Sequence, residues 1–130
     1  MKTRKYSFWI LMLIGCLITT QSFYAQNYRK LDSIINVAGN EIYVNPDHVI
    51  EVGQTIVKNA GDNVNYKIKG YKLVSDAYSS KRDYEKSLEY LIKASELLDQ
   101  SNDELLKISI VNKTGIQYHQ LKVYDKAIQH

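Results

Sequence analysis

The sequence contains a single cysteine, Cys16, which lies in an apolar stretch near the N-terminus. The rest of the chain therefore has no thiol for a disulfide framework or a cysteine-ligated metal site. Proline and tryptophan each occur once and phenylalanine twice, whereas tyrosine occurs eleven times. Because a tyrosine ring has an apolar body and a polar tip, this usage favours half-buried helix packing over a deep, dry core.

Catalytic motifs are absent as well. The sequence has no G-x-S-x-G, phosphate-binding loop, G-x-G-x-x-G or H-E-x-x-H, and no carboxylate pair stands apart from ordinary i,i+4 spacings. No two of the histidines His48, His119 and His130 are three or four residues apart, so metal-ligand spacing is missing too. We therefore expect no enzyme activity, no metal and no cofactor.

An excess of charge is also missing from most of the chain. The net charge of +3 arises from Lys2, Arg4 and Lys5, and no acidic residue precedes Asp32. Removing these three from the 17 Lys and Arg leaves 14, against 14 Asp and Glu. Nucleic-acid affinity depends largely on clustered cations. We therefore expect no nucleic-acid binding by this part of the protein.

Residues 1–25 have the three parts of a secretory signal peptide, namely a cationic start, an apolar run and a polar end. The apolar run, Phe8 to Ile18, covers eleven residues, fewer than the roughly 20 that a membrane-spanning helix needs. The pattern predicts export and cleavage between Ala25 and Gln26.

A bacterial lipoprotein signal is the alternative interpretation of this leader. Leu13-Ile14-Gly15-Cys16 matches a lipobox, in which Cys16 becomes the lipidated N-terminus. Leu17 and Ile18 extend the apolar run beyond Cys16, whereas a lipoprotein core ends at the cysteine. This favours cleavage after Ala25 over lipidation.

Apolar spacing predicts a first, degenerate helical hairpin over residues 26–62. Its first helix covers residues 27–43. Asn45-Pro46 starts the second helix, with Asn as the N-cap and Pro at the first helical position. Gly61 is suited to the left-handed conformation that ends such a helix.

A second hairpin is predicted over residues 63–101, with a polar elbow at residues 79–83 and Asp83 as the N-cap of its second helix. Residues 102–130 are predicted to form the start of a third hairpin. Ser101 and Glu104 have the spacing of a capping box at the beginning of its first helix. Its predicted second helix begins near Tyr124. The first helix of this hairpin is expected to carry an apolar stripe, which consists of Leu105, Ile108, Val111, Gly115, Tyr118 and Leu121. Because so short a second helix leaves that stripe uncovered, we expect the chain to be the N-terminal part of a longer protein.

The two later hairpins repeat each other. An offset of 40 residues places Tyr78 on Tyr118, and Tyr84-Glu85-Lys86-Ser87-Leu88 on Tyr124-Asp125-Lys126-Ala127-Ile128. Periods of this size indicate stacked supersecondary units, because one helical hairpin cannot bury its apolar face alone. The sequence therefore predicts an all-α solenoid of about two and a half hairpins behind the leader.

These hairpins resemble the tetratricopeptide repeat, in which W-x2-L-G-x2-Y precedes A-x3-F and a proline. The second hairpin carries the pattern in Tyr71, Val74, Ser75, Tyr78, Ser87 and Leu91, and the third in Val111, Thr114, Gly115, Tyr118 and Ala127. Tryptophan and the terminal proline are missing, and the period exceeds the usual value of about 34 residues. The resemblance implies close helix crossings at Ser75, Ser87, Gly115 and Ala127.

The resemblance also implies a function. In tetratricopeptide arrays the first helix of each hairpin lines a concave groove that binds proteins or peptides. The corresponding positions here are Lys72, Asp76, Ser79, Asn112, Ile116 and His119. Among them, Lys72 or Asn112 is suited to hold a carboxylate or a peptide backbone.

A leader followed directly by long-period repeats looks like the periplasmic N-terminal part of membrane-spanning transcriptional regulators of Gram-negative bacteria. In that family a transmembrane helix and an AraC-type or LuxR-type DNA-binding domain follow the repeats. DNA binding and membrane spanning would then belong to residues beyond those given. Two alternatives stay open: the sensor region of a histidine kinase, and a periplasmic scaffold protein.

Overall fold

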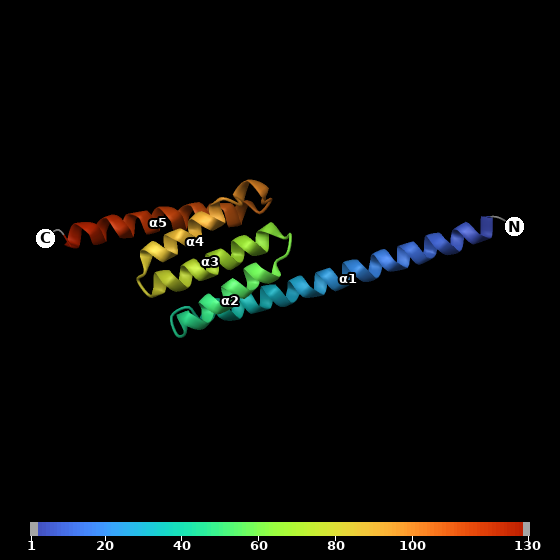
Figure 1. Ribbon diagram of the computed structural model, residues 1–130, viewed down its shortest axis with the longest axis horizontal. Coiled ribbons are helices and arrows are strands. Elements are labelled where there is room, and N and C mark those ends of the chain that lie inside the picture. Colours follow the sequence, from blue (N-terminus) through green and yellow to red (C-terminus); the bar gives the residue numbers. More distant parts are fainter. Residues whose placement is uncertain (1–2, 129–130) are drawn as a thin grey trace. The chain divides into compact units, whose positions relative to one another are not determined.

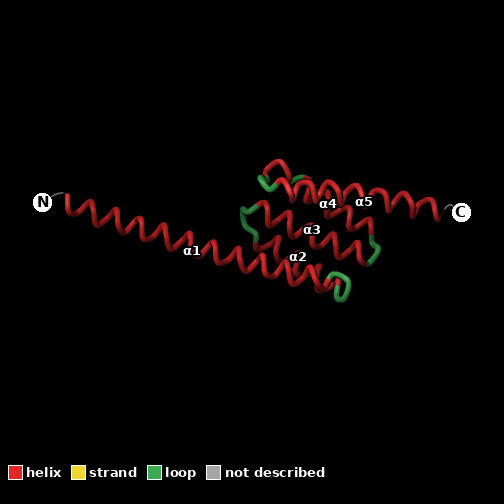
Figure 2. Tube along the Cα trace, turned by 180° about the vertical axis from the view of Figure 1, so that it is seen from behind, coloured by secondary structure: helices red, strands yellow, loops and turns green. Residues whose placement is uncertain are grey.

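The computed structural model describes the backbone of residues 3–128 and the side chains of residues 9–18, 22 and 25–122. All regular structure in these residues is helical, with short loops between the helices (Figure 2), which confirms the predicted all-α fold class. The chain forms two compact units, residues 1–33 and 34–130.

The first unit contains most of helix α1 (Thr3–Glu41). Ala25 and Gln26 are exposed residues inside this helix, and Cys16 is also exposed. Export, cleavage and lipidation stay predictions. Over the described residues, no helix combines the length and the hydropathy needed to cross a membrane. The unit exposes these large apolar side chains of the leader: Trp9, Ile10, Leu11, Met12, Leu13, Ile14, Leu17 and Ile18.

The second unit begins with the last turns of α1 and continues through a series of neighbouring helices (Figure 1). Helix α2 packs on α3, α3 on α4 and α4 on α5, and α3 also contacts α5. Helix α3 is therefore the central element that all three others touch. The bounds of these elements are α2 (Pro46–Asn59), α3 (Val64–Ser80), α4 (Tyr84–Ser95), the 3-10 turn η1 (Leu98–Gln100) and α5 (Glu104–Ile128).

The predicted helix starts of α2 and α4 are confirmed. The Asn45 side chain accepts a hydrogen bond from the His48 N–H at 3.4 Å, and Pro46 occupies the first turn of α2. Asp83 accepts from the Lys86 N–H at 3.1 Å. Each side chain satisfies a backbone donor that has no partner within its own helix.

The turns after α2 and α3 both use a left-handed residue. Gly61 has the predicted positive φ, at 55°, and Arg82 takes the same conformation at 62°. At the end of α3 the Arg82 N–H donates to the Ser79 carbonyl and the Asp83 N–H to the Tyr78 carbonyl, both at 3.0 Å. This pair of bonds is the Schellman arrangement, which closes the helix by satisfying its last carbonyls.

The predicted capping box at the start of α5 is wrong. Asp103 is the N-cap, and its carboxylate accepts from the Leu106 N–H at 2.9 Å. Ser101 lies two residues before this N-cap, where its hydroxyl accepts from the Asp103 N–H at 3.1 Å and donates to Oδ1 of Asn65 at 2.6 Å. Glu104 is exposed and pairs with Lys107 instead.

The predicted break near Tyr124 is also wrong, because α5 continues as one helix to Ile128. Residues 120–124 contain neither glycine nor proline, so nothing local ends the helix there. The expected apolar stripe is largely exposed in this chain, with Leu105 at 80% and Val111 at 61% of their full accessibility. Helix α5 instead packs through the next residues round the helix, Leu106 and Ile110, which join a core cluster with Ile68, Leu91 and Ala94.

Small residues lie where helices cross. The crossing predicted at Ser75 and Ser87 is confirmed. Ser75 of α3 and Ser87 of α4 are buried and joined by a hydrogen bond of 2.8 Å between their hydroxyls. Gly115, by contrast, has open space where a Cβ would lie. The side chain of Ala127 is outside the described residues.

Candidate functional site

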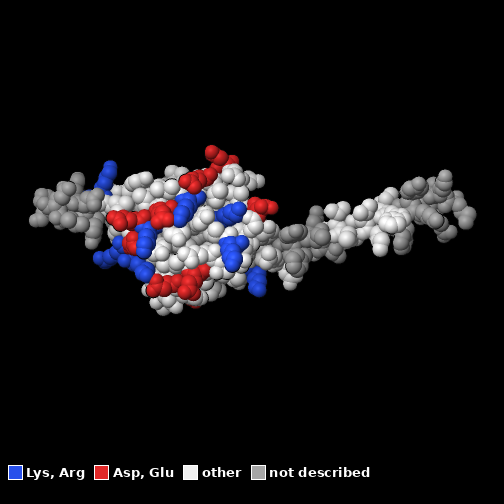
Figure 3. Space-filling view, viewed as in Figure 1, with Lys and Arg blue, Asp and Glu red and all other residues white. Residues whose placement is uncertain are grey.

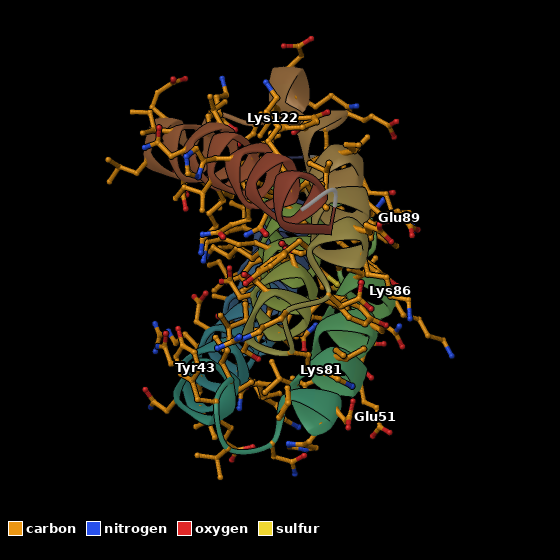
Figure 4. All side chains as sticks on the ribbon, turned by 90° about the vertical axis from the view of Figure 1, so that its left-hand side faces the viewer. Tyr43, Glu51, Lys81, Lys86, Glu89 and Lys122 are labelled. Atoms are coloured by element: carbon orange, nitrogen blue, oxygen red, sulfur yellow. The ribbon has the colours of Figure 1, made fainter. Side chains whose placement is uncertain are left out.

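The helices of the second unit form two layers, which are visible end-on in Figure 4. One layer contains the C-terminal end of α1 together with α3 and α5, the first helix of each predicted hairpin. The other contains α2 and α4. Tyr43, at the end of α1, lies on the opposite side from Glu51 of α2 and from Lys86 and Glu89 of α4.

The first layer encloses a pocket of about 280 Å³. Helices α3 and α5 and the residues directly after α1 all contribute lining side chains. The lining residues are Ile42, Tyr43, Asp76, Ser79, Ser80, Lys113, Ile116 and Gln117.

A carboxylate between two ammonium groups is the charged feature of this pocket. Lys72 donates to Oδ2 of Asp76 at 3.1 Å, and Lys113 donates to Oδ1 at 2.5 Å. The Asp76 side chain is only 15% exposed. The Asp76 carboxylate ties α3 to α5 through Lys113. It neutralises only one of the two lysines, so Lys72, Asp76 and Lys113 together keep one net positive charge.

An amide and two hydroxyls form the uncharged part. Gln117 Nε2 donates to the Ser79 hydroxyl at 3.1 Å. The Ser80 hydroxyl lies 2.9 Å from the carbonyl oxygen of Ile42, which ties the segment after α1 to α3. Gln117 is 5% exposed, and its Oε1 atom is buried without any hydrogen-bond partner. Among the buried side-chain nitrogen and oxygen atoms of the described residues, it is the one without a hydrogen-bond partner.

Three of the six residues predicted for the groove meet in this pocket: Asp76, Ser79 and Ile116. Lys72 reaches it through its bond to Asp76. Asn112 and His119 are exposed on α5 and do not line it. A ligand carboxylate bound by Lys72 would therefore have to share its ammonium group with the carboxylate of Asp76.

Lys113 and Gln117 were not predicted, because the face of α5 that packs lies one residue round the helix from the expected apolar stripe. A second set of residues with helical spacing was present: Leu106, Ile110, Lys113 and Gln117 follow each other at four, three and four residues. Two of these are apolar and two polar, so the set was a weaker signal than the fully apolar stripe. Ile42, Tyr43 and Ser80 lie at segment ends, where no periodic pattern identifies them.

The other layer carries a tyrosine cluster beside a shallower pocket of about 220 Å³. The Tyr90 ring stacks on Tyr78 with centroids 5.7 Å apart and lies 6.2 Å from Tyr71. Lys93 lies 4.5 Å above the Tyr90 ring, and its hydrogen bond to Glu89 raises the pKa of the ammonium group. These rings pack against one another, as expected for repeat core.

Charges of both signs are interspersed on the face of the second unit that Figure 3 shows. His48 bonds to Glu41 at 2.9 Å, His119 is exposed, and His130 lies outside the described residues. Within the described part of the chain, no group of three or more His, Cys, Asp or Glu is placed to hold a metal ion.

No protein family, curated protein or solved structure matches the chain. The case for a function therefore rests on the geometry of the pocket and on the sequence patterns.

Proposed function

We propose that this chain is a protein- or peptide-binding module built from tetratricopeptide-like hairpins, and that the layer of α1, α3 and α5 holds the ligand. The observation that supports this is the convergence of three segments on one pocket with charged, amide and apolar groups. Ser79 meets Gln117 and Asp76 meets Lys113 at separations of 38 and 37 residues. These separations are close to one repeat, as neighbouring copies of a hairpin require.

The cellular setting is a further part of the proposal. The leader of residues 1–25 supports export, with the module on the periplasmic side of a Gram-negative inner membrane. There it would serve as the sensory part of a membrane-spanning transcriptional regulator. A histidine-kinase sensor and a periplasmic scaffold are the competing assignments, and the residues that follow the module in the whole protein distinguish the three.

Peptide binding is testable by selection from a displayed library of random twelve-residue peptides on the immobilised full chain. Isothermal titration of the enriched peptides then compares wild type with Ile116→Glu, which places a carboxylate beside Asp76. The matched control is Ile92→Glu, at an exposed isoleucine of α4. We expect Ile116→Glu to weaken binding by about tenfold or more, that is by about 1.4 kcal/mol, because it replaces an apolar lining side chain of the pocket with a charged one. Ile92→Glu should have little effect. Failure to enrich any peptide, or equal binding by both variants, would contradict the proposal.

Export is tested separately by N-terminal sequencing of the secreted protein in a Gram-negative host. Mature protein that begins at Gln26 supports cleavage after Ala25. A lipidated N-terminal Cys16 would show that the lipoprotein interpretation is right.

A further inference from the structure

We propose that α5 pairs in antiparallel orientation with the α5 of a second copy of this chain, through a face that we call the α5 seam. This inference goes beyond the proposed function, because none of the seam residues lines the pocket and the pairing needs no peptide. The seam consists of residues along one side of the helix, namely Glu104, Ile108, Val111, Gly115, Tyr118 and Lys122.

The seam is a side of α5 that this chain leaves open to water. Helix α5 lies at the edge of the second unit (Figure 1), where it packs on α4 and contacts α3. The apolar seam residues Ile108, Val111 and Tyr118 keep between 50% and 61% of their full accessibility. A Cβ on Gly115 would meet nothing within 4 Å. The seam is therefore an exposed apolar strip that carries charge only at its two ends, as expected of a surface that a partner helix covers.

The spacing of the seam indicates that the partner is a second copy. Its residues follow each other at four, three, four, three and four positions, and this order is the same from either end. Residues at these spacings share one face of a helix. A two-fold axis at the centre of the seam therefore places each residue of one copy opposite a seam residue of the other, which is the self-complementary arrangement of a symmetric dimer.

Charge complementarity supports the antiparallel orientation. The seam has a carboxylate at one end, Glu104, and an ammonium group at the other, Lys122, which Figure 4 labels. Antiparallel copies place Glu104 of each opposite Lys122 of the other, so opposite charges meet at both ends. Glu104 also bonds to Lys107 of its own helix at 2.9 Å, but its side chain is 74% exposed and keeps acceptor positions for a second cation. Parallel copies would bring like charges together at both ends, which disfavours association.

The sizes of the inner seam residues match in the same orientation. Val111 of one copy lies opposite Gly115 of the other, where the open space beside the glycine admits the valine methyl groups. Ile108 lies opposite Tyr118, so an aliphatic side chain covers an aromatic ring. Large residues thus meet small or flat ones, which is how two helices interdigitate at close approach.

The pairing is expected to be weak. Glu104 and Lys122 are eighteen residues apart, so the seam is about 27 Å long at roughly 1.5 Å per residue. We expect one pair of helices of this length to bury less than about 1,200 Å², the range of weak and transient complexes. A Kd on the order of 50 μM is typical of such a contact, and at about 1 μM the chain is then monomeric, with Gly115 and Lys122 exposed to solvent.

Sedimentation velocity of the full chain, at concentrations from about tenfold below to about tenfold above this Kd, measures the association. We expect Lys122→Glu to weaken it by about tenfold, because two carboxylates then meet at each end of the seam. Glu104→Lys should have a similar effect. The double variant, Glu104→Lys with Lys122→Glu, should restore the association, because it exchanges the charges without removing the pairs. Association through the apolar leader would be the same in all of these proteins.

Gly115→Leu tests the space opposite Val111. The larger side chain should weaken association by more than about tenfold, because it overpacks the centre of the seam. The matched control is Gly39→Leu in α1, where a Cβ would also meet nothing within 4 Å, and it should associate like wild type. Circular dichroism checks that both variants keep the helical fold.

A zero-length carbodiimide cross-link identifies the contact itself. Within one chain Glu104 and Lys122 lie about 27 Å apart along the same helix, so an amide bond between their side chains forms only between two copies. We expect mass spectrometry to find this cross-link in wild type and to lose it in Gly115→Leu. A missing cross-link, unchanged association in Lys122→Glu, or no rescue in the double variant would overturn the inference. A monomer at every concentration would do so as well, and the seam would then belong to a helix of a different partner.

Discussion

Gly53 of α2 and Gly70 of α3 face each other where the two helices cross, and neither position has room for a side chain. A Cβ on Gly53 would lie 3.0 Å from the Gly70 carbonyl oxygen and 2.6 Å from Cγ2 of Val74. A Cβ on Gly70 would lie 2.9 Å from the Gly53 carbonyl oxygen and 2.7 Å from Cγ2 of Val57. This contact joins α2 directly to α3.

Gly53→Ala and Gly70→Ala should therefore both destabilise the protein. Overpacking of this kind costs about 1 to 3 kcal/mol, while alanine gains about 1 kcal/mol over glycine from helix propensity. We expect a net loss on the order of 1 kcal/mol, and a slightly larger one for Gly70, whose Cβ would lie 2.9 Å from a backbone oxygen against 3.0 Å for Gly53. Urea unfolding of the full chain measures the difference.

Gly115→Ala is the matched control for these variants, since a Cβ on this α5 residue meets nothing within 4 Å. It should stabilise the protein by up to about 1 kcal/mol. If the Gly53 and Gly70 variants gained stability in the same way, the close crossing of α2 and α3 would be disproved.

The buried hydroxyls of Ser75 and Ser87 provide a second test, because each is the other's partner at 2.8 Å. Ser75→Ala or Ser87→Ala alone leaves one buried hydroxyl unpaired, at a cost of about 1 to 3 kcal/mol. The double variant removes both groups, so its cost should be well below the sum of the two. A double-mutant cycle from denaturation curves measures this coupling.

Ser95→Ala serves as the reference substitution, since the Ser95 hydroxyl bonds only to the Leu91 carbonyl one turn earlier in α4. Such a bond within the same helix adds little to stability. Strictly additive costs for Ser75 and Ser87 would show that the two hydroxyls do not depend on each other.

Local side-chain chemistry explains which features of the fold were predictable. Asn45 and Asp83 were identified as caps, and Gly61 as a helix stop, because each acts on backbone groups within three residues of itself. The Ser75 and Ser87 crossing followed from the repeat pattern, which places small residues at matching positions.

The orientation of α5 was not predictable in the same way, because the helix is apolar on two sides. Leu105 and Ile108 follow one stripe, and Leu106 and Ile110 another. Packing against Ile68 of α3 and its neighbours buries the second stripe. Tertiary contacts, and not the pattern of α5 itself, therefore decide which stripe is buried. The same rotation brought Lys113 and Gln117 into the candidate site, which explains why Asp76 and Ser79 on α3 were found and their partners on α5 were not.

Two substitutions at the start of α5 distinguish an Asp103 N-cap from a capping box formed by Ser101 and Glu104. Asp103→Ala removes the carboxylate that accepts from the Leu106 N–H, so we expect a loss of about 1 kcal/mol. Glu104→Ala removes only an exposed pair with Lys107 and should change stability by less than about 0.5 kcal/mol. Thermal unfolding of the two variants compares them directly. A larger loss for Glu104→Ala would restore the capping box that begins at Ser101.

Lys81, at the end of α3, pairs with Asp47 in the first turn of α2 and so links the two helices. This hydrogen bond, together with the nearby negative charge, raises the pKa of Lys81 above its ordinary value of 10.5. A group whose pKa is higher in the folded state stabilises that state while both states are protonated. The contribution is therefore fully present below about pH 10.5 and is lost as the pH rises through the folded-state pKa.

Urea unfolding of wild type and Lys81→Met at pH 8 and above pH 11 measures this dependence. We expect Lys81→Met to be less stable than wild type at pH 8 and the difference in stability to disappear at the higher pH. Added salt should narrow the gap at pH 8, because exposed ion pairs are screened. Lys122→Met, at an exposed lysine of α5, controls for the loss of one cation. A gap at pH 8 that survived above pH 11 would mean that Lys81 acts through its methylene chain and not through its charge, because only the charge titrates.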